Sequence, residues 1–130
     1  MRWTLAGFMI ILLLIDDDEM SRDLIKTRLD RLGYVVITAG NGREGVETAR
    51  TVSPDVILMD LCMPGMDGFE ATKLIKSDPA TAHIPIVALT ALNTNTDVGH
   101  AVRVGFDSYA TKPVDLNSLY SKITDLVRRA

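Results

Sequence analysis

The chain has little of what several classes of protein need. It holds one cysteine, Cys62, so it cannot form an internal disulfide. Its formal net charge of −3 provides no basic excess, and we expect no direct binding to nucleic acid, whose phosphates require a basic face. Internal repeats, low-complexity segments and linker-like stretches are also absent. With 130 residues, 47% of them hydrophobic, the sequence fits one domain with one core.

A run long enough to span a membrane is also missing. The longest nearly apolar stretch, residues 3–15, has thirteen residues, whereas a transmembrane helix needs about 20. Arg2 could start a signal peptide, but no small-residue cleavage pattern follows, and cleavage would remove the first predicted strand. We therefore interpret residues 1–9 as an apolar N-terminal extension and residues 10–130 as the domain. Alternatively, Trp3, Leu5 and Phe8 form a sticky segment that pairs with a second chain, which would make the protein a homodimer.

Four short runs each end in a polar or charged residue. Ile10–Ile15 is apolar without alternation, which is typical of a strand buried on both faces, and Asp16-Asp17-Asp18 follows it. The other runs and the residues that end them are Val56–Met59 with Asp60, Ile86–Leu89 with Thr90, and Ser108–Thr111 with Lys112-Pro113. Residues 34–38 are rich in β-branched residues and add another strand.

Segments with helical spacing of apolar residues alternate with these strands. The predicted helices cover residues 21–32, 41–52, 69–77, 93–105 and 116–129. Their expected apolar stripes include Leu24, Ile25, Leu29, Leu32, Phe69, Leu74 and Ile75. Five strands alternating with five helices predict an α/β fold, in which helices cover both faces of a parallel sheet through right-handed crossovers.

The polar strand ends predict a single site. In an open parallel sheet, ligands bind outside the carboxyl ends of the strands. Adjacent carboxylates repel one another, and a hard divalent cation with oxygen ligands relieves that repulsion. Two or three carboxylates, the Thr90 hydroxyl and the Lys112 ammonium would converge there, which favours a site for a metal ion and a phosphoryl group.

Together these motifs resemble one family. Ile15–Glu19, Ile57–Gly68, Ala88–Ala91 and Tyr109–Pro113, in this order and each at a strand end, are similar to the receiver domains of two-component response regulators. The resemblance covers nearly the whole chain from Ile10. It implies a three-layer, doubly wound, flavodoxin-like fold with five parallel strands in the order 2-1-3-4-5.

The resemblance also implies a role for each site residue. Asp60 would accept a phosphoryl group from a histidine kinase or a histidine phosphotransfer protein in a phosphorelay. Asp16, Asp17, Asp60 and the backbone carbonyl of Cys62 would bind Mg²⁺ or Mn²⁺. The Thr90 hydroxyl would hydrogen-bond the phosphoryl group, and Lys112 would pair with it. Asp18 lies outside the acidic pair, and we expect it to cap the following helix.

Further expectations concern the switch and its output. Tyr109 matches an aromatic residue that swings inward on activation, and the peptide bond before Pro113 is expected to be cis. Output would be a contact with a downstream protein through the fourth helix, fifth strand and fifth helix, in the cytoplasm. Such a protein is not an enzyme beyond its own phosphorylation and slow dephosphorylation. His83 and His100 are expected at the surface and not as phosphodonors.

Two positions depart from the family pattern. In the family that the motifs resemble, the residues at these two positions, two after the phosphoacceptor and two after the hydroxyl residue, tune the lifetime of the phosphoryl group. Here they are Cys62, two after Asp60, and Leu92, two after Thr90. Neither side chain readily positions an attacking water, so we expect slow self-dephosphorylation.

Four alternatives stay open at this point. The run Thr111–Leu116 is also similar to receiver domains within hybrid histidine kinases, so the chain could be a part of such a protein or of a multidomain regulator. A binding-only pseudo-receiver is a third form of the same fold. A phosphatase of the haloacid dehalogenase type would want an acidic residue where Cys62 stands. A flavin carrier would want a Ser/Thr/Gly phosphate loop where three aspartates stand.

Overall fold

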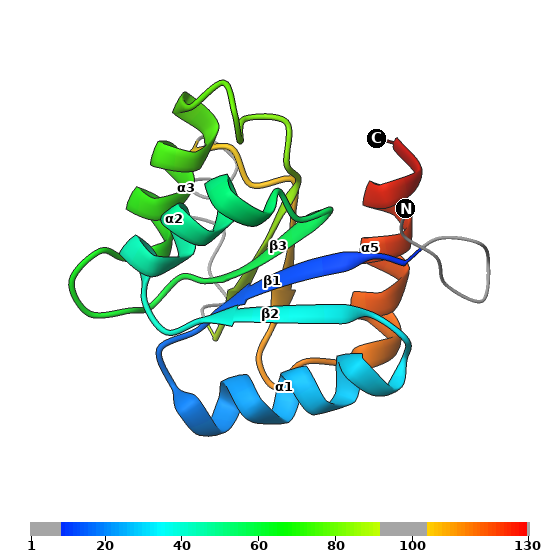
Figure 1. The fold of residues 1–130 in the computed structure, drawn as a ribbon. Helices are drawn as coiled ribbons and strands as arrows, with labels where there is room; N and C mark the ends of the chain where they lie inside the picture. Colours follow the sequence, from blue (N-terminus) through cyan, green and yellow to red (C-terminus); the bar gives the residue numbers. More distant parts are fainter. Residues whose placement is uncertain (1–8, 92–103, 130) are drawn as a thin grey trace.

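The computed structural model describes residues 9–91 and 104–129 (Figure 1). The strands are β1 (Ile11–Ile15), β2 (Val35–Ala39), β3 (Val56–Asp60), β4 (Ile86–Thr90) and β5 (Ser108–Thr111). The helices are α1 (Glu19–Arg31), α2 (Gly42–Val52), α3 (Gly68–Ser77) and α5 (Leu116–Arg129). Within these ranges, no helix combines the length and the hydropathy needed to cross a membrane.

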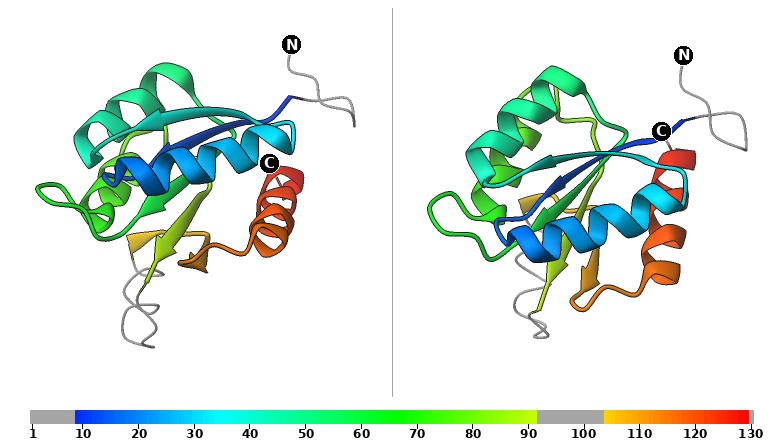
Figure 2. Two further views of the ribbon diagram at one scale, coloured as in Figure 1. Left: turned by 90° about the horizontal axis from the view of Figure 1, so that it is seen from below. Right: turned by 60° about the horizontal axis from the view of Figure 1, so that its bottom comes forward.

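The five strands form one parallel sheet in the order β2-β1-β3-β4-β5. This confirms the predicted strand order and the doubly wound α/β class. Helices α1 and α5 cover one face of the sheet, and α2 and α3 cover the other (Figures 1 and 2). The helix predicted at residues 93–105 falls almost entirely on residues 92–103, which lie outside the described ranges.

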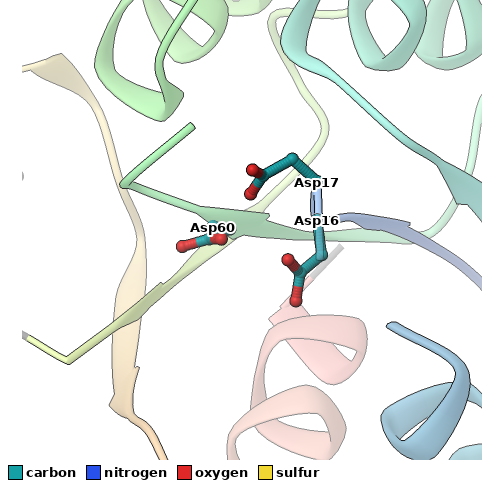
Figure 3. A group of neighbouring side chains, drawn as sticks. All are labelled: Asp16, Asp17 and Asp60. Atoms are coloured by element: carbon teal, nitrogen blue, oxygen red, sulfur yellow. The ribbon is translucent and has the colours of Figure 1, made fainter. Parts of the chain in front are cut away.

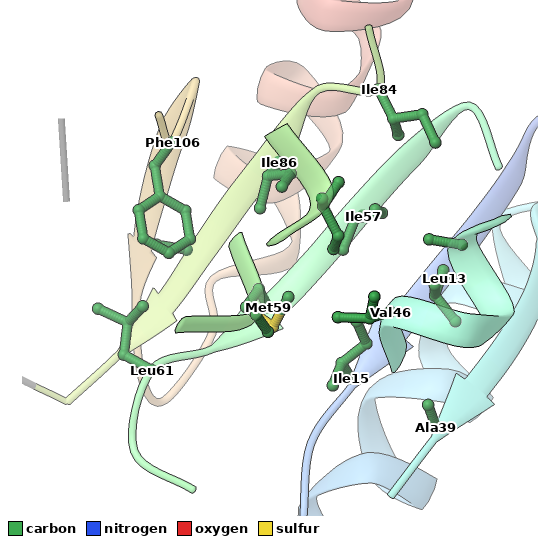
Figure 4. Packing of buried hydrophobic residues seen from close by; sticks show 14 of the residues in the cluster. Leu13, Ile15, Ala39, Val46, Ile57, Met59, Leu61, Ile84, Ile86 and Phe106 are labelled. Carbon is green, nitrogen blue, oxygen red and sulfur yellow. The ribbon is translucent and has the colours of Figure 1, made fainter. Parts of the chain in front are cut away.

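Alternating side chains of the central strands divide the core into two clusters. Leu13 and Ile15 of β1 pack beneath α2 and α3 (Figure 4), whereas Leu12 and Leu14 pack against α1 and α5. All five residues of β3 are buried, as are all five of β4. A strand with helices on both faces has no solvent-facing side, which explains why these runs are apolar without alternation.

Aspartate and asparagine side chains set where three helices begin. Asp18, Asn41 and Asp67 are the N-caps of α1, α2 and α3, and each accepts hydrogen bonds from backbone N–H groups of the first turn. The Asp18 cap is as predicted, but α1 begins at Glu19, two residues before the predicted start. The reason is that Asp18 already accepts bonds from the N–H groups of Met20 and Ser21.

Part of the predicted helical packing is wrong. Leu24, Leu32 and Leu74 are about half exposed, whereas Ile25, Leu29 and Ile75 are buried. Leu32 is the C-cap of α1, and in the other two cases the next residue along the chain, Ile25 or Ile75, is buried instead. Apolar spacing identifies the helix but overestimates the width of its buried face.

Helix α2 approaches β1 so closely that one helical position excludes a side chain. A Cβ atom at Gly45 would lie 2.4 Å from Ile15 Cδ1 and 2.8 Å from Ile15 Cγ1, and Ile15 is fully buried. Such distances require Ile15 to move within a packed core.

We therefore predict that Gly45→Ala lowers the free energy of unfolding by about 1–3 kcal/mol through overpacking, despite the gain of about 1 kcal/mol in helix propensity. Urea denaturation measures this. The loss should shrink in an Ile15→Val background, which removes the nearest clashing carbon. Glu47→Ala, at an exposed position of the same helix, should change stability by less than about 0.5 kcal/mol. An unchanged or more stable Gly45→Ala protein would contradict the steric argument.

Candidate functional site

The sheet brings the predicted polar residues to one edge. Ile15 pairs with Met59, Asp60 with Leu89, and Thr90 with Thr111, so neighbouring strands end at the same level. The backbone N–H of Lys112 donates to the Thr90 carbonyl at 2.8 Å, which continues the ladder beyond the end of β5. Residues that lie far apart in sequence therefore meet at the carboxyl ends of β1, β3, β4 and β5.

Three carboxylates gather at this edge (Figure 3). One carboxylate oxygen from each of Asp16, Asp17 and Asp60 lies within 4.8 Å of the others. Asp16 is fully buried and Asp60 is 6% exposed, whereas Asp17 faces solvent. Two of the three carboxylates are thus largely removed from water, and an unpaired charge is costly in such a buried position.

Lys112 supplies the compensating charge. Its Nζ lies 3.0 Å from Asp16 Oδ2 and 3.4 Å from Asp60 Oδ2, and its side chain is 22% exposed. The ammonium therefore bridges the two buried carboxylates from a position 96 residues along the chain from Asp16.

Backbone groups hold the same two carboxylates. The Asp18 N–H donates to Asp16 Oδ1 at 3.0 Å, and the Cys62 N–H donates to Asp60 Oδ1 at 3.2 Å. With one oxygen held by the backbone and the other by Lys112, each carboxylate has a fixed orientation.

The family model for the response regulator receiver domain matches residues 12–124. The chain belongs to this family. The resemblance seen in the sequence is thereby confirmed, and the dehalogenase-type phosphatase and the flavin carrier find no support.

Curated relatives agree with this receiver assignment. The chain is 38% identical to PilH of Pseudomonas aeruginosa over 112 residues, which cover 86% of the chain and 93% of PilH. It is 38% identical to the response regulator PleD of Caulobacter vibrioides over 90% of the chain, but this is only 26% of PleD. It is 39% identical to the transcriptional regulatory protein AfsQ1 of Streptomyces coelicolor over 91% of the chain and 51% of AfsQ1. The receiver thus spans nearly all of one relative and a quarter to a half of the others.

Solved structures of the same fold include a chemotaxis protein and a receiver domain of a sensor histidine kinase. The chemotaxis protein CheY4 of Vibrio cholerae matches with a TM-score of 0.85 and 30% identity, over 91% of this chain and 98% of that one. The receiver domain of a sensor histidine kinase from Pseudomonas aeruginosa PAO1 matches with a TM-score of 0.85 and 29% identity, over 92% and 98%. That domain was crystallised with a magnesium ion coordinated in its active site cleft.

Thr90, Cys62 and Pro113, which were also predicted for the site, lie at this edge of the sheet. Thr90 ends β4 and is 4% exposed, and the Cys62 side chain is exposed just after β3. The Lys112–Pro113 peptide bond is cis. Tyr109 in β5 is 44% exposed, and Lys122 of α5 donates to its backbone carbonyl while lying 5.3 Å from its ring centroid. His83 is exposed; Leu92 and His100 lie outside the described residues.

Two residues that support the site, Arg22 and Gly68, were assigned no role from the sequence, although Gly68 closes the motif Ile57–Gly68. Arg22 donates to the Asp16 carbonyl at 2.8 Å. Gly68 starts α3 against the backbone of Asp60 and Leu61. Only glycine fits there, because a Cβ would lie 2.3 Å from the Asp60 carbonyl oxygen and 2.8 Å from Leu61 Cα. A glycine directly after the Asp67 helix cap could have indicated this close approach, whereas the Arg22 contact depends on tertiary structure.

The electrostatics of the receiver site fit a cation. Burial and the nearby Asp16 charge raise the pKa of Asp60 to about 6, against the opposing effect of Lys112. Burial alone would raise the pKa of Asp16, but the Asp18 N–H and Lys112 outweigh it and lower that pKa. One ammonium thus leaves excess negative charge among three carboxylates. Oxygen ligands in this arrangement suit Mg²⁺, so the residues present fit the ion.

We predict that ionised Asp60 destabilises the metal-free receiver. Its folded-state pKa of about 6 exceeds the ordinary value of 3.8, so between these values the folded state binds more protons than the unfolded state. The free energy of unfolding in EDTA should therefore fall by about 1–3 kcal/mol as the pH rises from about 4 to about 7. The lowered pKa of Asp16 acts below this window.

The matched variant is Asp60→Asn, which should lack this component of the pH dependence and be more stable than the parent at pH 7 in EDTA. Urea unfolding at several pH values measures the difference between the two proteins, in which titrations common to both cancel. Parallel pH profiles would refute the assignment.

Proposed function

We propose that this receiver is a phosphoacceptor switch of a two-component phosphorelay. Asp60 would take the phosphoryl group from a phosphohistidine of a histidine kinase or a histidine phosphotransfer protein. The observation that carries the proposal is the Lys112 ammonium bridging the Asp16 and Asp60 carboxylates, with Asp17 beside them at the carboxyl edge of the sheet. Response regulators interact with histidine kinases, which makes such a donor the natural partner.

The proposed reaction is a transfer between two side chains. An Asp60 oxygen attacks the phosphorus atom as the nitrogen–phosphorus bond of the phosphohistidine breaks, and the imidazole nitrogen keeps the bonding electrons and takes up a proton. An acyl phosphate forms on Asp60. Lys112, now 3.4 Å from Asp60 Oδ2, is placed to pair with the incoming phosphoryl oxygens, and the Thr90 hydroxyl would hydrogen-bond them.

Asp16, Asp17, Asp60 and the Cys62 carbonyl would hold Mg²⁺ or Mn²⁺. When bound, the ion supplies positive charge that offsets the repulsion between the carboxylate nucleophile and the anionic phosphoryl group. The carboxylate cluster and the magnesium-bound receiver of the Pseudomonas kinase support this assignment. The residues of the chain orient the nucleophile, since Cys62 N–H and Lys112 each hold one oxygen of Asp60.

The switch would act on the face formed by β5 and α5 together with the fourth helix expected from the sequence. We propose that the Thr90 hydroxyl moves to the phosphoryl group and that Tyr109, now 44% exposed, turns inward. A downstream protein in the cytoplasm would read this change. The contacts of Lys122 with the Tyr109 carbonyl and ring support a coupling between the two elements.

The receiver is either a stand-alone protein or a domain of a larger one. We propose a stand-alone regulator with residues 1–9 as an extension and 10–130 as the receiver, because the chain spans 93% of PilH. The short coverage of PleD and the similarity to a sensor kinase receiver favour a domain of a larger protein instead. A homodimer formed through the apolar residues of the extension is compatible with both. The phosphorylation chemistry is the same in each case.

We predict that intact-protein mass spectrometry after incubation with acetyl phosphate and Mg²⁺ shows one added phosphoryl group. Asp60→Asn should show none, because it removes the nucleophile. Lys112→Met should slow the reaction by about tenfold or more, because it removes charge stabilisation at the reacting oxygens. No added mass on a folded, Mg²⁺-binding parent would leave a binding-only pseudo-receiver as the function.

We further predict that the phosphoryl group, once attached, is lost slowly. Neither Cys62 nor Leu92 can readily orient a water molecule for attack, so decay of the phosphorylated mass should take minutes or longer. Cys62→Asn introduces an amide that can hydrogen-bond water and should shorten the lifetime; Cys62→Ala should not. A parent half-life of seconds would show the prediction to be wrong.

A further inference from the structure

We propose that Arg22 is a positioning residue for the metal-binding turn after β1. Its Nη1 donates to the backbone carbonyl of Asp16 at 2.8 Å across a partly buried contact. The inference deepens the proposed function, because it names a residue that prepares Asp16 and Asp17 for the cation without touching it. Arg22 lies in the first turns of α1, six residues after Asp16.

The end of the β1–β2 ladder explains why Asp16 needs this donor. The Val35 N–H donates to the Ile10 carbonyl, and the Asp16 N–H donates to the Ala39 carbonyl. In a parallel ladder, the next bond would run from the N–H of residue 41 to the Asp16 carbonyl. Asn41, however, is the N-cap that turns the chain into α2. The Arg22 guanidinium supplies the bond instead, so the carbonyl at the sheet edge is satisfied.

This bond fixes the peptide unit that joins the two metal-ligand candidates. The Asp16 carbonyl and the Asp17 N–H belong to one planar group, so holding the carbonyl sets the rotation of the whole plane. Asp16 itself is held on its N–H by Ala39 and on its carboxylate by Asp18 N–H and Lys112. Exposed Asp17 receives its direction from the plane that Arg22 holds.

The guanidinium also connects this turn to the β2–α2 turn. A Cβ at Gly40 would lie 3.4 Å from Arg22 Nη1 and 3.8 Å from Glu44 Oε2, so all three groups lie together. Glu44 Oε2 in turn accepts the Gly40 N–H at 3.2 Å. The Arg22 guanidinium therefore lies close to the start of α2, whose first turn is capped by Asn41.

Charge and position predict opposite effects of removing Arg22. The guanidinium is a positive charge beside an acidic site, so its loss should strengthen Mg²⁺ binding if only electrostatics mattered. If Arg22 positions the turn, its loss should weaken binding, because a less ordered pair of carboxylates must be arranged by the ion. Loss of a group that orients metal ligands typically costs at least tenfold in affinity.

The test measures Mg²⁺ affinity by isothermal titration calorimetry on the parent, Arg22→Met, Arg22→Lys and the control Arg28→Met. The control removes the same charge from an exposed position of the same helix. We expect Arg22→Met to weaken Mg²⁺ binding by about tenfold, Arg22→Lys to weaken it less, and Arg28→Met to leave it unchanged or slightly tighter.

Unchanged or tighter Mg²⁺ binding by Arg22→Met would overturn the proposal. If that variant is unfolded in EDTA by circular dichroism, Arg22→Lys decides instead, and parent-like affinity in it would count against positioning. The affinity measurement needs no phosphoryl transfer. Weakened Mg²⁺ binding in a series whose parent cannot be phosphorylated would therefore support the role of Arg22 while rejecting the proposed switch.

Discussion

The ammonium of Lys112 between the carboxylates of Asp16 and Asp60 is the interaction on which the site depends. Two acids at adjacent strand ends, both largely buried, would repel each other without it. The compensation is partial, since the pKa of Asp60 still rises to about 6. A fully neutralised pair would have little reason to attract a divalent ion, and an uncompensated one would weaken the fold. The receiver lies between these limits.

The sheet makes this arrangement possible because β3 and β4 are buried along their whole length. The four apolar residues of β3 are fully buried, so Asp60 stands at the end of the strand, where the chain leaves the core. Right behind it, Gly68 lets α3 start against the Asp60 backbone. The apolar core thus restricts where charge can lie, and the helix starts hold the turns that carry it.

Much of this could be predicted from the sequence, because strand ends and helix caps leave local signals. The runs ending at Asp16, Asp60 and Thr90 predicted both the sheet and its functional edge. What failed was the width of buried helix faces, where Leu24 and Leu74 proved exposed, since spacing alone does not say which flank meets the sheet. The hydrogen bond from Arg22 to the Asp16 carbonyl could not be predicted from the sequence. It replaces a bond of the β1–β2 ladder, and only the folded structure shows that the ladder ends before that bond.

The 96-residue separation of Lys112 from Asp16 has a consequence for synthesis on the ribosome. While the chain emerges, Asp16, Asp60 and the strands β1 to β4 are synthesised before Lys112, which balances the charge of the two acids. The same late segment carries Leu119, Ile123 and Leu126, which fill one face of the core. A nascent receiver therefore lacks its charge balance and part of its core together, so stable folding must await its last elements. Premature termination before α5 would leave the core cluster around Leu12 and Leu14 without Leu119, Ile123 and Leu126.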